Sequence, residues 1–467
     1  MTSDFSTKVR RDQAEFFREI PGPKPSWLVG NLPALSVDWP WLTCAKWART
    51  YGGLFKIQLG STPALVVSDP RLIREILCDR WQDFHKAAPH DALAPVITRE
   101  SLFISNLPHW TTLRQHHPLH QVDSRLWYPR LVEPLRQTVR RQLQAWIRLS
   151  RSSRIDLHDQ MQFLTFQAFG QANWGGNVPT THYRWFQTLA RTGSWRMMLP
   201  DRLLPWMPLG PFFRAARRWW YSEYDARVRA ARQEAPTPAT APHDLLRLTL
   251  QQGTILTDPQ LTEALATNYF GGVFSCSSAL NTALYYLSRQ PDELRRVRAA
   301  VQELLPADHN WTLEQLQACE PLEQVIREAL RLRPPVPLYF RSSPVDRETT
   351  LGPYRLPPNT TLFVMQWFAH CESDYWGDPE RFRPPRWDAA CREQNPYGSD
   401  YFFPFGRGPR HCIGADFACF YLRLALATFL SECELQFPAD SVYRQAFFFG
   451  VMMPRGLSVK VEPVRGK

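Results

Sequence analysis

The residues best suited to chemistry lie near the C-terminus, in the segment 405–414, which reads Phe-Gly-Arg-Gly-Pro-Arg-His-Cys-Ile-Gly. Its glycines let the backbone approach a bulky group closely and turn amides toward a sulfur. Cys412 lies beside arginines and just before an expected helix over 415–430, which favours the thiolate, the form that ligates iron. Arg410 could reach the anionic edge of a planar cofactor. The alternative is a buried cysteine with a purely structural role.

Two pairs of residues at helical spacing each contain a cation. Trp110 and Arg114 lie four residues apart on one helical face, where a cation–π contact is the ordinary interpretation. Glu328 and Arg331 lie three apart, a spacing that ordinarily gives an ion pair worth about 0.2–0.5 kcal/mol. Arg386 follows them, shortly before the cysteine segment. Taken singly, each pair indicates only local stability.

A long helix is expected from residue 257 to about residue 289. It starts with Thr-Asp-Pro, which supplies a capping side chain and a proline at the first helical position. At about 1.5 Å per residue, the rod would be roughly 45 Å long. Gly271 and Gly272 lie in its middle, and each costs about 1 kcal/mol relative to alanine. Tight helix–helix packing would justify them, as would close approach of a cofactor and dioxygen.

The chain resembles the cytochromes P-450 in its motifs and in their order along the sequence. The motifs are the two pairs, the two glycines, Arg386 and the pattern Phe-x-x-Gly-x-Arg-x-Cys-x-Gly. The resemblance implies bound haem b, iron protoporphyrin IX, with the Cys412 thiolate as the axial ligand of the metal. It implies a buried network that braces the cofactor core, formed by Glu328, Arg331 and Arg386. The residues that it assigns to cofactor binding are Trp110, Arg114, Arg341, His370, Phe405, Arg410, Cys412 and Gly414.

In the family, the long helix carries an oxygen-activation motif that reads small residue, Gly, any residue, acid, Thr, Thr. Alignment places this motif on Gly271 to Cys276, so that Gly272, Phe274 and Ser275 take the catalytic positions. Ser275 keeps a hydroxyl that could hold a water or deliver a proton, whereas Phe274 stands where relatives have a carboxylate. This departure puts ordinary proton delivery in doubt. If the missing acid is limiting, Phe274→Asp should speed oxygen activation.

The resemblance implies a mainly α fold with a small β region, the cytochrome P-450 fold, as one domain over 20–467 behind a polar extension over 1–19. It implies a monooxygenase that oxidises a hydrophobic small molecule with O2 and electrons from a separate ferredoxin or flavodoxin. The expected lining of the substrate pocket is Val336, Leu338, Phe448 and Phe449. The pocket does not choose among lipids, terpenoids, steroids and aromatic natural products.

Two alternatives stay open. The first keeps the fold but, because the acid is missing, uses peroxide-dependent oxidation, oxidative coupling, isomerisation or dehydration. The second is a non-catalytic haem-binding protein, which would need another protein ligand to the iron. No His or Met stands beside the glycine pair to supply one.

The apolar patterns and turn residues predict the elements that position these side chains. Helices are expected over 38–51, 130–149, 158–173 and 321–333, and strands over 54–59, 64–67, 351–357 and 360–363. Residues 85–108 lack clear periodicity and are expected to form a long loop, which in the family covers the substrate.

Composition bounds the remaining questions. The 467 residues are 44% hydrophobic and 21% charged, as in ordinary soluble globular proteins, and the net charge of +11 suggests an acidic partner or anionic ligand. No zinc-finger spacing or dense basic run supports a nucleic acid partner. Nine cysteines without paired spacing and the lack of a signal peptide favour a cytoplasmic, soluble protein.

The segment 195–213 interleaves aromatic residues and arginines, which fits a peripheral membrane contact, an entry lid or core packing.

Overall fold

The computed structural model describes residues 12–37, 40–60, 62–87, 93–198, 210–234, 244–306, 311–448 and 450–464. These residues group into two compact units that interleave along the sequence. The first unit lies within Met1–Ala92, Arg331–Arg381 and Ala389–Cys412, and the second within Leu93–Leu330, Phe382–Asp388 and Ile413–Lys467. The predicted single domain over 20–467 stays a prediction.

The first unit is built on a four-stranded sheet in the order β1-β2-β7-β4. β1 (Leu54–Leu59) and β2 (Thr62–Val67) form an antiparallel hairpin, β7 (Thr361–Val364) runs parallel to β2, and β4 (Tyr339–Ser342) runs antiparallel to β7. Inward-facing residues of β2 and β7 are fully buried in one apolar core. The strands predicted over 54–59, 64–67 and 360–363 are confirmed to within two residues.

The strand predicted over 351–357 is wrong. Gly352 adopts a φ of +53°, in the left-handed region that turns the chain. The segment therefore forms a hairpin of two short antiparallel strands, β5 (Thr349–Leu351) and β6 (Tyr354–Leu356).

The first unit also contains short helices. They are α2 (Leu32–Val37), α3 (Pro40–Tyr51), α4 (Pro70–Arg74), η1 (Glu75–Asp79), α17 (Gln366–His370), α18 (Ser373–Trp376) and α19 (Ala389–Gln394). α17 follows β7 directly and is wholly buried at Gln366 and His370. It is the element that supports the cysteine segment, as described below.

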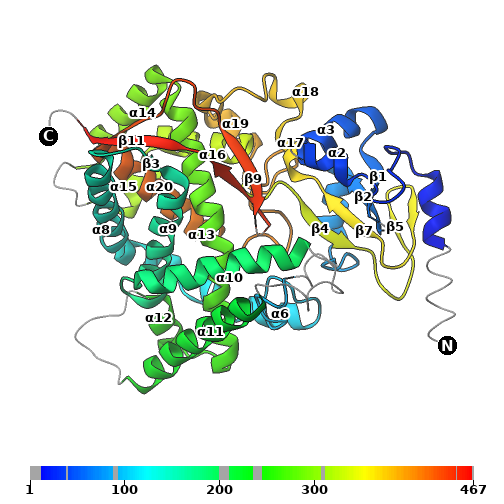
Figure 1. Ribbon diagram of the computed structural model, residues 1–467, viewed down its shortest axis with the longest axis horizontal. Helices are drawn as coiled ribbons and strands as arrows, with labels where there is room; N and C mark the ends of the chain where they lie inside the picture. The colour runs from blue at the N-terminus through cyan, green and yellow to red at the C-terminus, as the bar shows by residue number, and fades with distance from the viewer. Residues whose placement is uncertain are drawn as a thin grey trace. The chain divides into compact units, whose positions relative to one another are not determined.

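The second unit is mainly helical (Figure 1). Its helices are α6 (His109–Gln115), α7 (Pro118–Gln121), α8 (Ser124–Ser150), α9 (Leu157–Trp174), α10 (Thr180–Met198), α11 (Gly210–Gln233), α12 (Leu245–Gln251), α13 (Asp258–Ser288), α14 (Pro291–Leu304), α15 (Leu313–Ala318), α16 (Glu320–Leu332, its end in the first unit), η3 (Pro384–Arg386) and α20 (Ala415–Glu432). Two small sheets complete it, β3-β11-β8 and the hairpin β9-β10. Their strands are β3 (Ile155–Asp156), β8 (Cys433–Gln436), β9 (Arg444–Phe448), β10 (Val451–Arg455) and β11 (Ser458–Pro463).

α13 is the central helix of this unit and packs against α9, α11, α20 and β10 (Figure 1). Its start is the predicted one. Thr257 is the N-cap and forms a capping box with Gln260, and a proline occupies the first turn. The long helix expected to end near residue 289 ends at Ser288.

α8 begins six residues before the predicted start at residue 130. The prediction started the helix after Pro129, whereas this proline lies inside the helix. Proline removes one helical hydrogen bond, but tertiary packing supports the first turns. Tyr128 stacks on Phe420 of α20 with 4.8 Å between ring centroids.

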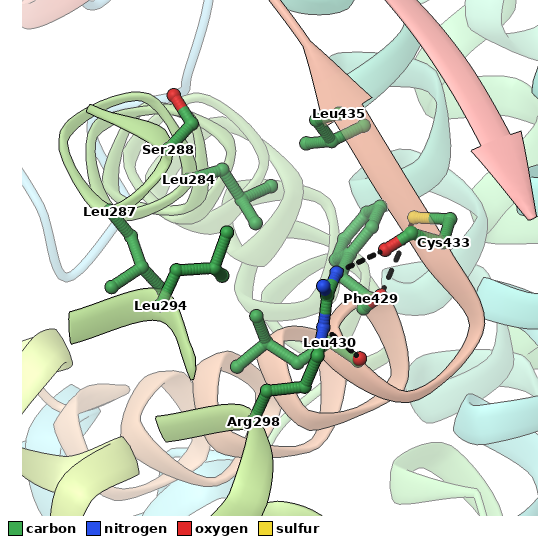
Figure 2. A pocket seen from close by; sticks show the side chains of 9 residues that line it. All are labelled: Leu284, Leu287, Ser288, Leu294, Arg298, Phe429, Leu430, Cys433 and Leu435. Carbon is green, nitrogen blue, oxygen red and sulfur yellow. Dashed lines mark hydrogen bonds between the residues drawn. The ribbon is translucent and has the colours of Figure 1, made fainter. Parts of the chain in front are cut away.

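The two ends of α20 are held differently. Its start follows the cysteine segment directly, and its C-terminal end is capped by Arg298 of α14 (Figure 2). The guanidinium donates to the carbonyl oxygens of Leu430 and Cys433, at 3.0 and 2.9 Å. The hollow beside it, walled mainly by leucines, has a volume of about 30 Å³, enough for little more than a water molecule.

No helix among the described residues is long and apolar enough to cross a membrane. The membrane contact predicted over 195–213 falls largely outside the described residues, because 199–209 are not among them. At its described end, Phe212 is 61% exposed and Phe213 is buried.

Candidate functional site

Cys412 is the only exposed thiol among the nine cysteines, all of which lie in described parts of the chain. It ends a closed turn of the first unit. The Cys412 amide donates to the carbonyl of Phe405 at 2.7 Å, and the Gly406 amide donates to the carbonyl of Phe403 at 2.8 Å. The segment thus holds its backbone by its own hydrogen bonds and leaves the sulfur accessible.

Two glycines shape this turn. Gly406 and Gly408 have φ angles of +73° and +69°, which L-residues with side chains rarely adopt. A Cβ on Gly408 would also lie 2.0 Å from the carbonyl oxygen of Leu77. Gly408 is therefore required by both its backbone angle and its neighbour, whereas Gly406 is required by its angle alone.

Two buried side chains of α17 hold the start of the turn. His370 accepts a hydrogen bond at Nε2 from the Phe403 amide at 3.0 Å. Gln366 donates from Nε2 to the carbonyls of Val336 and Pro404, at 2.8 and 3.4 Å. This geometry makes both residues supports of the cysteine turn. The assignment of His370 to cofactor binding stays a prediction, and the role of Gln366 had no signal in the sequence.

Arg341 and Arg410 form a second feature of the first unit. Arg341 lies on β4 and is 7% exposed, and its guanidinium donates to the carbonyl of Phe340 at 2.7 Å. Arg410 is partly buried, with its guanidinium 5.6 Å from the ring centre of Trp81. Burial lowers the pKa of each to about 10, and at Arg341 the charge of Arg410 adds to the effect. His85 belongs to the same cluster, since burial and the charge of Arg410 lower its pKa.

These side chains fit an anionic, thiolate-ligated planar group. Two guanidinium groups that repel each other across a partly dry interior are stabilised by an anion such as a carboxylate. Tyr339 adds to the chemistry of this cluster, because burial and the neighbouring Cys412 raise its pKa. Arg341, Arg410 and Cys412 are thus the residues of the first unit that could hold a haem, by its carboxylate edge and its iron.

Four further residues predicted to bind the cofactor or the substrate have the following local surroundings. Phe405 packs edge-on against Tyr397 at 5.4 Å, and Gly414 is the N-cap of α20. Val336 and Leu338 lie partly buried just before β4. Whether they contact a ligand stays a prediction.

The structure brings Glu328 and Arg386 together in the second unit. The Glu328 carboxylate is fully buried and accepts hydrogen bonds from Arg386 Nε at 3.4 Å, the Arg383 amide at 2.9 Å and Trp387 Nε1 at 2.9 Å. A buried carboxylate needs such donors. The backbone amide and the tryptophan are members of the network that sequence reasoning missed.

Arg331 is also fully buried, and its guanidinium is used as a backbone clamp. It donates to the carbonyls of His370 and Pro379, at 2.9 and 2.8 Å. Through His370, this clamp continues to the support of the cysteine turn.

Trp110 and Arg114 lie on α6 in the second unit. Trp110 is 5% exposed, and the Arg114 guanidinium lies 5.9 Å from its ring centre. The predicted cation–π geometry is therefore present. A contact of either residue with a haem propionate stays a prediction.

The glycine pair of α13 has two different environments. A Cβ on Gly272 would lie 2.0 Å from the Phe169 ring of α9, so close helix packing requires this glycine. A Cβ on Gly271 would meet nothing within 4 Å. Ser275 donates its hydroxyl to the carbonyl of Gly271 at 2.6 Å. Its oxygen thus lies on the open side of the helix together with Gly271.

Phe274 points into an aromatic cluster. It is 1% exposed, stacks on Phe186 at 5.1 Å and meets Phe448 edge-on at 5.2 Å. With Phe447 and Phe448 it lines a cavity of about 480 Å³. Phe449, predicted to line the substrate pocket, lies outside the described residues.

Arg407 adds little exposed positive charge beside Cys412. It is 8% exposed, and its guanidinium forms an ion pair with Asp400 at 2.6 Å. The charge at this position is therefore largely neutralised and buried.

Comparisons with known proteins agree with this geometry. A family model described as Cytochrome P450 matches residues 20–461. The chain is 34% identical over 190 residues to Cytochrome P450 4V2 of Mus musculus, covering 40% of this chain and 35% of that protein. It is 27% identical over 437 residues to Bifunctional cytochrome P450/NADPH--P450 reductase 1 of Bacillus subtilis (strain 168), covering 89% of this chain and 40% of that protein. The chain thus spans 35% and 40% of the length of these relatives.

The fold has a match among solved structures. The crystal structure of the cytochrome P450DA heme domain superposes with a TM-score of 0.82 at 22% identity, covering 96% of this chain and 97% of that one. The mainly α fold with small sheets predicted from the sequence is confirmed, and this chain belongs to the cytochrome P450 family.

Proposed function

We propose that this chain is a haem-thiolate monooxygenase that oxidises a hydrophobic small molecule. The observation that carries the proposal is the exposed Cys412 thiol, held in a glycine-shaped turn of the unit that also contains the buried pair Arg341 and Arg410. When bound, a thiolate-ligated haem favours cleavage of the O–O bond of dioxygen.

The chain's own residues have separate tasks in this proposal. Cys412 would ligate the iron, and Arg341 and Arg410 would bind the carboxylate edge, where an anion offsets the repulsion between the two guanidinium groups. Trp110 and Arg114 would bind a haem propionate. Ser275 holds a proton at Oγ, which it now donates to the Gly271 carbonyl. The supports His370 and Gln366 act through the turn and touch no reacting atom.

Electrons come, in this proposal, from a separate ferredoxin or flavodoxin. The Bacillus subtilis relative carries a reductase in its name, so an electron donor is part of that protein. Because Arg407 is buried and paired, an acidic donor would rely on other cations of this chain.

The proposal is tested by the absorption spectrum of the purified protein, reduced with dithionite and exposed to carbon monoxide. We expect a strongly red-shifted Soret band, its loss in Cys412→Ser, and its retention in the control Cys391→Ser. A band at the position of histidine-ligated haem, or an unchanged spectrum in Cys412→Ser, would refute the ligand assignment and favour the haem-binding alternative.

A second candidate function keeps the haem but uses a peroxide-type substrate, a coupling, an isomerisation or a dehydration. The observation that favours it is the burial of Phe274 among aromatic rings at the position of the missing acid. Turnover supported by hydrogen peroxide and unaffected by a ferredoxin system would select this function. In the monooxygenase, Ser275→Ala should raise the fraction of reducing equivalents lost as peroxide.

A further inference from the structure

The cavity of about 480 Å³ lies wholly within the second unit, between α9, α10, α13 and the β9-β10 hairpin. This volume is in the range of small-molecule sites. Part of its wall is apolar and is formed by Phe274, Phe447, Phe448 and Met453. These side chains suit a hydrocarbon body.

The rest of the wall is polar, which the sequence did not predict. Gln162 and Ser194 line it and are 6% and 8% exposed. The Ser194 hydroxyl has no hydrogen-bond partner among the described residues, and neither does Nδ1 of His158, which lines the same wall. Buried polar atoms are normally paired, so this part of the wall is suited to a polar ligand group or ordered water.

The form of the His158 ring follows from its neighbour. Gln162 Nε2 lies 2.7 Å from His158 Nε2, so a donating amide leaves the ring proton on Nδ1. Burial lowers the pKa of His158, because an uncharged ring is favoured away from water; the charges of Asp159 and Asp156 oppose this effect, and the weaker effects of Arg455 and Arg191 add to it. The neutral ring therefore presents an N–H donor rather than a charge.

The charged residues of the wall are Arg191 of α10, Arg455 of β10 and Asp159 of α9. Neither arginine forms an ion pair or side-chain hydrogen bond with any described residue. All three charged side chains are exposed to solvent, and the two arginines outnumber the one aspartate. The polar part of the wall, called the polar end below, thus has a net positive charge and several hydrogen-bond donors.

The apolar and polar ends of the cavity are separated along strand β10. Val451 pairs with Phe448 next to the hairpin turn, and Arg455 ends the same strand. At about 3.3 Å per residue, Arg455 lies about 13 Å from Val451 along the strand. A ligand that contacts both ends is therefore elongated.

We propose that the substrate is an amphipathic carboxylate. Its hydrocarbon body lies against Phe274 and Phe448, and its carboxylate is bound by Arg191 and Arg455, with the Ser194 hydroxyl and His158 Nδ1–H as further donors. Guanidinium groups bind carboxylates with paired, charge-assisted hydrogen bonds. This inference rests on the proposed function, because it names the substrate class of the proposed monooxygenase.

The test is calorimetric titration of the purified holoenzyme with dodecanoate and with dodecanol, which share a chain and differ in the charged end. We expect dodecanoate to bind the wild type about tenfold or more tightly than dodecanol, as charged hydrogen bonds imply. The double variant Arg191→Gln/Arg455→Gln should lose this preference and leave dodecanol binding within about twofold. The control Arg184→Gln removes an exposed arginine of α10 that does not line the cavity, and it should keep the preference.

Each outcome decides the inference. Equal binding of the two probes to the wild type overturns it, as does undiminished dodecanoate binding by the double variant or a failure of both probes to bind. Higher salt should weaken dodecanoate binding and spare dodecanol. The carbon monoxide spectrum of the same sample reports separately on the haem. A normal haem band without carboxylate preference refutes this inference alone, and a preference without that band refutes the proposed function alone.

Discussion

Replacing each glycine of the α13 pair by alanine should have opposite effects on stability. Both are in the interior of one helix, so each alanine gains the same helix propensity, about 1 kcal/mol. The difference lies in what the new Cβ meets. At Gly271 it meets nothing within 4 Å, whereas at Gly272 it lies 2.0 and 2.2 Å from two atoms of the Phe169 ring.

The Phe169 ring has little freedom to move away. To restore ordinary contact at 3.4 Å it would have to shift by about 1.4 Å from the 2.0 Å position. It packs against Tyr269, Phe417 and Tyr421, with ring centroids 6.2, 5.3 and 6.4 Å away. Overpacking of this kind costs about 1–3 kcal/mol. We therefore expect Gly271→Ala to raise the free energy of unfolding by about 0.5–1 kcal/mol and Gly272→Ala to lower it by up to about 2 kcal/mol, which is the overpacking cost less the gain in helix propensity.

The assay is urea denaturation followed by far-UV circular dichroism, with both variants and the wild type in one series. Since the propensity gain is shared, the difference between the variants measures the clash directly. Adding Phe169→Leu to Gly272→Ala should recover part of the loss. Equal midpoints for the two alanine variants would refute the packing explanation of Gly272. A stabilised Gly271→Ala with reduced haem content would assign that glycine to cofactor approach.

Three further predictions concern backbone and charge. In urea denaturation, Gly408→Ala should lower the free energy of unfolding more than Gly406→Ala does, by about 1–3 kcal/mol, because only Gly408 combines a positive φ with a backbone clash. Glu328→Gln should cost about 3 kcal/mol or more in urea denaturation, since it leaves a buried arginine uncompensated, whereas the exposed pair of Asp225 predicts less than about 1 kcal/mol for Asp225→Asn. Burial raises the pKa of Glu263, so its stabilising contribution is present at low pH and is lost as the pH rises through that raised pKa. The stability of Glu263→Gln relative to wild type should therefore improve from pH 4 to pH 8, and a constant difference would contradict this.

Much of the cysteine turn was predictable because its pattern is local. Glycine positions in a short segment report backbone angles directly, and Gly406 and Gly408 indeed adopt positive φ. The start of α13 was predictable for the same reason, since a capping residue and a proline act within one turn. Local rules failed where contacts with a distant segment determine the structure. The first turns of α8, for example, continue through Pro129 because they pack against α20.

The supports of the site were not predictable from spacing. Gln366 and His370 reach the turn 33 or more residues away along the chain, and nothing in their neighbourhood marks them. Arg341 and Arg410 come together only because β4 and the cysteine turn belong to one unit. The polar wall of the cavity was not predictable either, because its residues come from α9, α10 and β10 and show no regular spacing in the sequence.

The environment of Phe274 changes what a carboxylate at this position should do. The sequence suggested that Phe274→Asp would restore proton delivery. In the structure, however, the side chain is 1% exposed and lies between Phe186 and Phe448. Removing the ring alone, as in Phe274→Ala, should cost about 3–5 kcal/mol, and a carboxylate adds the cost of burying a charge among aromatic rings.

We therefore expect Phe274→Asp to unfold at lower urea concentration than Phe274→Ala and to consume oxygen no faster than wild type. The pair of variants separates the loss of packing from the effect of the charge. If Phe274→Asp matched Phe274→Ala in stability and also improved coupling of oxygen to product, water from the cavity would have to reach this position.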